Sequence, residues 1–142
     1  MFQIGTFYKC FEFSKYKELE DSLRDYCSKR KIKGTIILTP EGVNATVSSE
    51  RERSLAELNE FLNDSIGTIK FRFSISDISP FKRLKIKKRQ ELVPSGTKGR
   101  SFDYQGNYLT PLEWSNFVED PNNIIIDVRN DYENKVGTFK NS

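Results

Sequence analysis

The sequence predicts an α+β fold over about residues 1–92, because strand-like and helix-like segments follow one another there in the order βαββαβ. Three observations lead to this prediction. Two segments of the chain repeat apolar residues at helical spacing, a short apolar run is followed by turn residues, and residues 68–76 alternate between apolar and polar side chains. Two helices can then cover one face of an antiparallel sheet, which is the ferredoxin-like arrangement.

The first strand is predicted over residues 4–11, IGTFYKCF, from its aromatic and β-branched content. A helix over roughly residues 15–30 follows, and Ser14 occupies its expected N-cap position. The apolar residues that recur at helical spacing in this helix are Tyr16, Leu19, Leu23, Tyr26 and Cys27.

A β-hairpin is predicted next, because the apolar run of residues 35–38 is followed by the turn residues PEGVN and then by alternating apolar residues. The stretch TPEGVNAT holds one glycine and precedes a strand, so a plain turn is favoured over a phosphate-binding loop. Ser49 and Glu52 have the spacing of a capping box for a second helix. The buried stripe expected for that helix is Leu55, Leu58, Phe61 and Leu62.

Residues 68–76, TIKFRFSIS, read as a half-buried strand whose inward side chains are Ile69, Phe71, Phe73 and Ile75. Residues 81–93 form a further extended segment, and residues 93–109 are expected to be a linker. Thr110, Pro111 and Glu113 provide three helix-start signals in a row. A strand at residues 124–126 and a helix from Asn130 complete a second region, residues 110–142.

The positive charge of the chain is concentrated in residues 81–100, which hold eight basic side chains and one acidic one within a chain of net charge +3. In an extended segment, Arg83, Lys85, Lys87 and Arg89 fall on one side and Lys82 and Lys88 on the other. Cations about 7 Å apart along one face can follow a phosphate backbone. We therefore expect nucleic-acid contact here, and the alternative is a charged edge strand that prevents edge-to-edge pairing.

Several classes of site are excluded by composition. The chain has no histidine, so neither a Ser-His-Asp triad nor a histidine-ligated metal site can be built from it alone. Cys10 and Cys27 lack metal or redox spacing, and Cys27 is expected to be a buried free thiol. No metal site and no cofactor are predicted. No apolar run is long enough to cross a bilayer, so a cytoplasmic protein without membrane contact is expected.

Asp127 and Arg129 follow the apolar run of residues 124–126, at the point where α/β folds often place their sites. The favoured interpretation is nevertheless a structural ion pair that orders the following turn. Asn130 and Glu133 then fit the N-cap and N3 positions of a short helix.

Three segments taken together resemble the rhodanese-domain tRNA uridine hydroxylases: GTIILTPEGVNATVS, then FKRLKIKKRQELV, then YLTPLEWSNFVEDPNNIIIDVRNDYENKVGTF. The likeness runs over nearly the whole chain, in order. It implies a ferredoxin-like, acylphosphatase-like domain over residues 1–92, followed by the first strand-helix unit of a truncated rhodanese-like α/β domain. It also implies oxygen-dependent 5-hydroxylation of the wobble uridine, with molecular oxygen as co-substrate and tRNA as partner.

The charge of the basic segment predicts RNA binding by Lys82, Arg83, Lys85, Lys87, Lys88 and Arg89. The resemblance adds roles for residues of the second region. Four residues match the opening motif of the rhodanese domain, which organises that domain without supplying its nucleophile: Asp127, Arg129, Glu133 and Gly137. The family's catalytic cysteine lies in a loop beyond that motif, whereas this sequence ends at Ser142. No catalytic residue is therefore expected in this chain.

Two functions stay open from the sequence. The chain is either a hydroxylase part that needs a separate chain carrying the rest of the rhodanese domain, or a catalytically inert RNA-binding fragment. A fragment of a rhodanese sulfurtransferase is a weaker third possibility, suggested by the motif alone.

Overall fold

The computed structural model describes residues 1–51, 53–92, 106–140 and 142, and the chain forms two compact units, Met1–Asp103 and Tyr104–Ser142. The first unit contains β1 (Phe2–Cys10), α1 (Leu19–Lys29), β2 (Lys33–Thr39), β3 (Gly42–Ser49), α2 (Ser54–Ile66), β4 (Arg72–Ser76) and β5 (Leu84–Lys88). The second contains α3 (Pro111–Glu119) and α4 (Asp131–Asn134). In the part of the chain described, no helix has the length and apolar character needed to cross a membrane.

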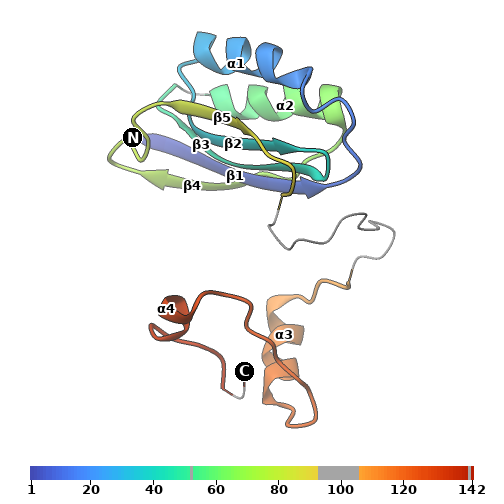
Figure 1. Ribbon diagram of the computed structural model, residues 1–142. Helices are drawn as coiled ribbons and strands as arrows, with labels where there is room; N and C mark the ends of the chain where they lie inside the picture. The colour runs from blue at the N-terminus through green and yellow to red at the C-terminus, as the bar shows by residue number, and fades with distance from the viewer. Residues whose placement is uncertain (52, 93–105, 141) are drawn as a thin grey trace. The chain divides into compact units, whose positions relative to one another are not determined.

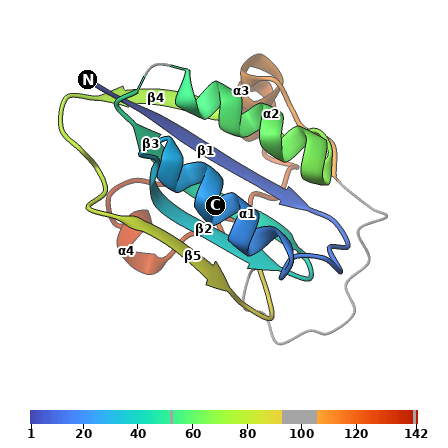
Figure 2. The ribbon, with the colours of Figure 1, turned by 90° about the horizontal axis from the view of Figure 1, so that it is seen from above.

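The first unit is one sheet with two helices on one face. Its strand order is β4-β1-β3-β2-β5, and β5 pairs with β2 in parallel while the other neighbours are antiparallel. Figures 1 and 2 show α1 and α2 side by side over the same face of the sheet. The predicted ferredoxin-like fold is confirmed, and neither helix in residues 1–51 and 53–92 lies on the other face of the sheet.

The core lies between the helices and the sheet, where Leu23, Ile36 and Leu58 are fully buried. The two helices are also joined to each other by a polar and aromatic contact. Tyr26 stacks on Phe61 with ring centroids 4.3 Å apart, and the Tyr26 hydroxyl donates to the carbonyl of Glu57 at 2.9 Å. The guanidinium of Arg30 lies 3.6 Å from the centroid of the Tyr26 ring. This contact fixes the register of one helix against the other.

The first helix begins later than the sequence predicts. Residues 14–18 form turns, and α1 starts at Leu19 with Glu18 at the N-cap and no side-chain cap, so the prediction of Ser14 as N-cap is wrong. The backbone N–H groups of Tyr16 and Glu18 donate to carbonyls three residues earlier. These tighter turns bury both Phe13 and Tyr16, and that burial outweighs regular helix geometry here.

The second helix also starts elsewhere. Ser49 is the last residue of β3, and its Oγ accepts from the N–H of Arg51 at 3.1 Å instead of capping a helix. The helix begins at Ser54, after Arg53 in a left-handed conformation with φ 65°. The capping box predicted at residues 49–52 is therefore wrong, although Glu52 itself lies outside the described residues. The predicted buried stripe of Leu55, Leu58 and Leu62 is confirmed, with Phe61 partly buried.

Of the four side chains predicted to point inward from residues 68–76, only two are covered. Ile69 is buried and Phe71 stacks on Phe7 at 4.2 Å, but Phe73 and Ile75 are 51% and 70% exposed. The cause is position, since β4 is an edge strand paired with β1 alone while α2 packs over β1 and β3. The predicted alternation of faces is therefore correct, since Phe73 and Ile75 lie on the helix side of the sheet. Their predicted burial is wrong, because neither α1 nor α2 covers this edge.

The hairpin between β2 and β3 forms as predicted, with Thr39 opposite Gly42. Gly42 has φ +132°, and a Cβ atom built on it would lie 2.0 Å from the carbonyl oxygen of Lys9 on β1. The Thr39 hydroxyl accepts from the N–H of Glu41 at 3.1 Å and donates to the carbonyl of Gly42 at 3.2 Å. The stretch is a plain turn, as the sequence indicates.

In the second unit, α3 begins as predicted. Thr110 is its N-cap, Pro111 its first residue, and Thr110 and Glu113 form a complete capping box. Residues 124–128 belong to no strand in the part of the chain described, so the predicted strand at residues 124–126 is wrong. An extended segment becomes a strand only when a neighbouring strand pairs with it. The predicted linker of residues 93–109 lies almost entirely outside the described residues.

Candidate nucleic-acid interface

The basic segment forms β5, an edge strand with two different faces. Leu84 and Ile86 point into the core, and Ile86 is buried opposite Ile36 of β2. Because side chains alternate along a strand, the cations at the odd-numbered positions from 83 to 89 point to the opposite, helix-free face of the sheet. These exposed cations are Arg83, Lys85, Lys87 and Arg89, the last held next to β2 by its N–H bond to the carbonyl of Leu38 at 3.0 Å. We call these four residues the basic row.

The structure adds Lys33 to this surface. Gly34 of β2 lies opposite Leu84, and its N–H donates to the carbonyl of Arg83 at 3.2 Å. Lys33 therefore lies beside Arg83 on the same face of the sheet. The sequence did not indicate this neighbour, because the parallel pairing of β2 with β5 joins segments about fifty residues apart. Within β2, the buried residues Ile36 and Leu38 alternate with residues that are polar or partly exposed. This alternation was the only local sign that Lys33 faces away from the core.

Lys82 and Lys88, the other two predicted RNA-binding residues, occupy different places. Lys82 is exposed just before β5 and lines a hollow together with Phe81 and Arg83. Lys88 lies on the helix side, where its Nζ is 2.6 Å from Oε2 of Glu20 on α1. That hydrogen bond raises the pKa of Lys88 and is the main reason why the pKa of Glu20 is lowered. The structure thus brings the basic row together and separates Lys88 from it.

In the second unit, Arg129 gathers the motif residues into one hydrogen-bonded cluster. Its Nε and Nη2 donate to the Asp127 carboxylate at 3.0 and 2.6 Å, and Nη2 also donates to the carbonyl of Gly137 at 2.7 Å. The Thr138 hydroxyl donates to Asp127 at 3.1 Å. The bonds from Arg129 hold the pKa of Asp127 well below its usual range. This geometry orders a turn around Asp127, and nothing in it marks a reacting group.

Glu133 belongs to the next turn. Its carboxylate accepts from the backbone N–H of Asn130 at 3.2 Å and from the Asn130 side chain at 2.9 Å, which caps α4 and lowers the pKa of Glu133. Of the four motif residues, Asp127, Arg129 and Gly137 are therefore in direct contact, whereas Glu133 acts through the helix cap.

Cys27 does not resemble an active nucleophile. Cys27 is fully buried in α1, as predicted, and burial raises the pKa of its thiol to about 12. Cys10 is partly exposed at the end of β1. Both belong to the first unit, whereas the Asp127 cluster belongs to the second. Across the described ranges, no group of three Asp, Glu or Cys side chains could hold a metal ion.

The fold agrees with the family whose model the chain matches. The fold defines the chain as an α+β protein. Residues 2–92 match the family described as the UPF0176 acylphosphatase like domain, and the chain belongs to that family. The chain is 36% identical to the tRNA uridine(34) hydroxylase of Wolbachia pipientis wMel over 99% of its own length and 52% of the relative's. It is 37% identical to the tRNA uridine(34) hydroxylase of Teredinibacter turnerae, covering 96% of this chain and 43% of that protein.

The chain thus spans about half the length of the curated relatives it matches. Among solved structures, an acylphosphatase from Coxiella burnetii is 13% identical with a TM-score of 0.43, covering 60% of this chain and 90% of that one.

Proposed function

We propose that this chain supplies the tRNA-binding part of an enzyme that hydroxylates uridine 34 of tRNA, the wobble uridine, at C5. The names of relatives that match nearly the whole chain support the substrate class. The observation that carries the binding role is the basic row: Lys85 and Lys87 within β5 and Arg83 and Arg89 just outside its ends, at every second position, on the helix-free face. Cations in such a row neutralise successive phosphates and release their counterions, which favours binding at low salt.

The salt dependence of tRNA affinity tests this role. Fluorescence anisotropy with labelled tRNA, between about 50 and 200 mM salt, should give a log–log slope near about −3 if the basic row neutralises four phosphates. Changing Arg83, Lys85, Lys87 and Arg89 to Ser should flatten this slope. The matched control changes four cations within α1 and the turns just before it to Ser: Lys15, Lys17, Arg24 and Lys29. An unchanged slope in the first variant would contradict the proposed binding surface.

We also propose that the chemical step, with molecular oxygen as co-substrate, relies on a cysteine outside the 142 residues of this sequence. Cys27 is buried, and its raised pKa keeps the thiol protonated at neutral pH. Aerobic incubation of this chain with unmodified tRNA, followed by mass spectrometry of the nucleosides, should show no 5-hydroxyuridine. Its formation by the pure chain would overturn this part of the proposal while leaving the binding role in place.

A further inference from the structure

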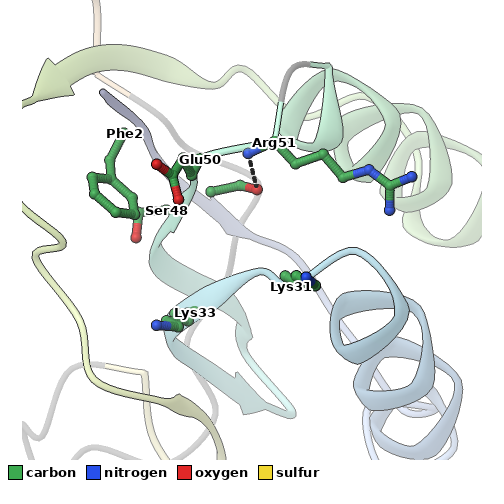
Figure 3. A pocket seen from close by; sticks show the side chains of 7 residues that line it. Phe2, Lys31, Lys33, Ser48, Glu50 and Arg51 are labelled. Carbon is green, nitrogen blue, oxygen red and sulfur yellow. Dashed lines mark hydrogen bonds between the residues drawn. The ribbon is translucent and has the colours of Figure 1, made fainter.

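A hollow of about 570 Å³ lies at the end of the sheet where β1 and β2 begin and β3 ends. Figure 3 shows the side chains that line it. Its volume lies within the range of about 300–1,000 Å³ that is typical of ligand sites. The function proposed above does not use this hollow.

Three strands contribute side chains to the hollow: Phe2 from β1, Lys33 from β2, and Ser48 and Ser49 from β3. Ser48 lies opposite both Ile4 and Lys33 in the sheet, so Phe2, Lys33 and Ser48 share the helix-free face, whereas Ser49 lies on the helix side. Ser48 is 1% exposed, and its Oγ has no hydrogen-bond partner among the residues that the structure describes. An unpaired buried hydroxyl is costly, and a ligand that hydrogen-bonds to Ser48 would remove that cost.

The charges around the hollow are divided between its two sides. Figure 3 shows the Glu50 carboxylate beside the Phe2 ring and Ser48, and it shows Lys31 and Lys33 on the other side. The guanidinium of Arg51 points away from Phe2, and its backbone N–H is bonded to Ser49. A bare anion would meet Glu50 as well as the two lysines. The arrangement therefore suits a ligand that has an anionic end and an end that donates hydrogen bonds.

A nucleotide has these properties. Its phosphate suits two ammonium groups, its base can stack on an aromatic ring, and base N–H groups can donate to a carboxylate or a hydroxyl. We propose that the hollow binds one nucleotide of a single-stranded RNA segment, with the base against Phe2 and the phosphate at Lys31 and Lys33. This inference rests on the proposed tRNA-binding role and deepens it, because it adds a base-stacking site to a surface of phosphate contacts.

A second hollow makes the path continuous. It has about 510 Å³ and is lined by Thr35, Pro80, Phe81, Lys82, Arg83 and Lys85. Lys33 of the first hollow lies beside Arg83 of the second, since Gly34 pairs with Leu84. Each hollow thus has one aromatic ring and at least two cations. An RNA strand that occupies both would continue along β5 over the rest of the basic row.

The test uses the full chain and a labelled single-stranded RNA hexamer. Phe2→Leu keeps an apolar side chain but removes the ring, and it should weaken binding by about tenfold, as expected for the loss of one base stack. Phe2→Tyr keeps the ring and should bind like the unchanged chain. Lys33→Gln should weaken binding and reduce the salt slope by about 0.7. Equal affinity of Phe2→Leu and the unchanged chain would overturn the proposal.

A measurement on the unchanged chain keeps the test independent of how the variants fold. In amide NMR spectra, the resonances of Phe2, Lys33 and Ser48 should shift with the hexamer and stay in place with inorganic phosphate at the same concentration. Equal shifts with phosphate would reduce the hollow to an anion site and overturn the nucleotide proposal. If Phe2→Leu binds normally while the basic-row variant does not, only the hollow is rejected. If the unchanged chain does not bind tRNA, the proposed function is rejected. The NMR shifts with the hexamer then show separately whether the hollow binds a nucleotide.

Discussion

The ammonium group of Lys88 lies 2.6 Å from the carboxylate of Glu20, and this ion pair joins the last residue of β5 to the first turn of α1. Glu20 also accepts from Arg24 at 2.8 Å, so its carboxylate is shared by two cations. Lys88 is therefore held on the helix side of the strand, while its neighbour Lys87 points to the opposite face. One basic segment thus contains two kinds of lysine, one tied to a helix and one available to a polyanion.

The two kinds should respond differently to removal of charge. Lys85→Gln should make the salt slope of tRNA binding shallower by about 0.7, the loss of one phosphate contact. Lys88→Gln removes the same charge and should leave the slope unchanged, because its side chain faces away from the basic row. Anisotropy titrations of both variants at several salt concentrations make the comparison. Equal slopes for the two variants would show that net charge, and not the face of β5, governs binding.

The alternation of Leu84 and Ile86 with cations was enough to predict the basic row, because a strand fixes the face of each side chain. The location of Lys33 could not be predicted in the same way, since it depends on β5 pairing with β2. Ser14 and Ser49 had the local signals of helix caps, but the burial of Tyr16 and the length of β3 overrode them. Local patterns therefore predicted the elements, whereas the hollow at Phe2, Lys33 and Ser48 depends on three distant strands.

Gly42→Ala should destabilise the first unit by about 2 kcal/mol or more. The residue adopts φ +132°, and an added Cβ would lie 2.0 Å from the carbonyl oxygen of Lys9, which cannot move without disturbing β1. Urea unfolding followed by far-UV circular dichroism measures the change. Gly106→Ala is the control, since an added Cβ there meets no atom within 4 Å. A similar small effect for both variants would argue against the close approach of the β2–β3 turn to β1.

The buried thiol of Cys27 should make the first unit less stable in alkaline solution. Its pKa is raised from 9.0 to about 12 in the folded state, so the folded chain keeps a proton that the unfolded chain loses. The stabilisation is complete below pH 9 and is lost as the pH rises towards 12. Unfolding free energies measured across this range should fall more steeply for the unchanged chain than for Cys27→Ala. Parallel curves for the two would contradict the burial of the thiol.

Backbone amides of residues 124–128 should exchange with solvent much faster than those of residues 35–47. The first group belongs to no described strand, and the side chains of Ile124, Ile126 and Val128 are 83%, 78% and 90% exposed. The second group forms β2, the turn and most of β3, where cross-strand bonds protect the amides. Hydrogen exchange followed by NMR compares the two directly. Comparable protection would mean that residues 124–128 pair with another strand in solution.

The carboxylate of Asp127 should make the second unit sensitive to acid. Its bonds from Arg129 and Thr138 hold its folded pKa well below the ordinary value of 3.8, so the folded state binds a proton less readily than the unfolded state. The stabilisation from this carboxylate is fully present above pH 3.8 and is lost as the pH falls through the folded pKa. Protonation would release Thr138, and the neighbouring Phe139 would then leave its edge contact with Trp114, whose centroid is 5.2 Å away.

Trp114 is the one tryptophan in the chain, so its fluorescence reports on the second unit alone. The unchanged chain should keep its native emission down to below pH 3.8 and lose it at lower pH. The side chain in Asp127→Asn has the same shape and can still accept a hydrogen bond from Arg129, but it carries no charge. The altered emission should therefore already appear near neutral pH. Glu119→Gln is the control, because it removes an exposed carboxylate at the end of α3. Native emission from Asp127→Asn at neutral pH would show that the ion pair with Arg129 does not hold this turn together.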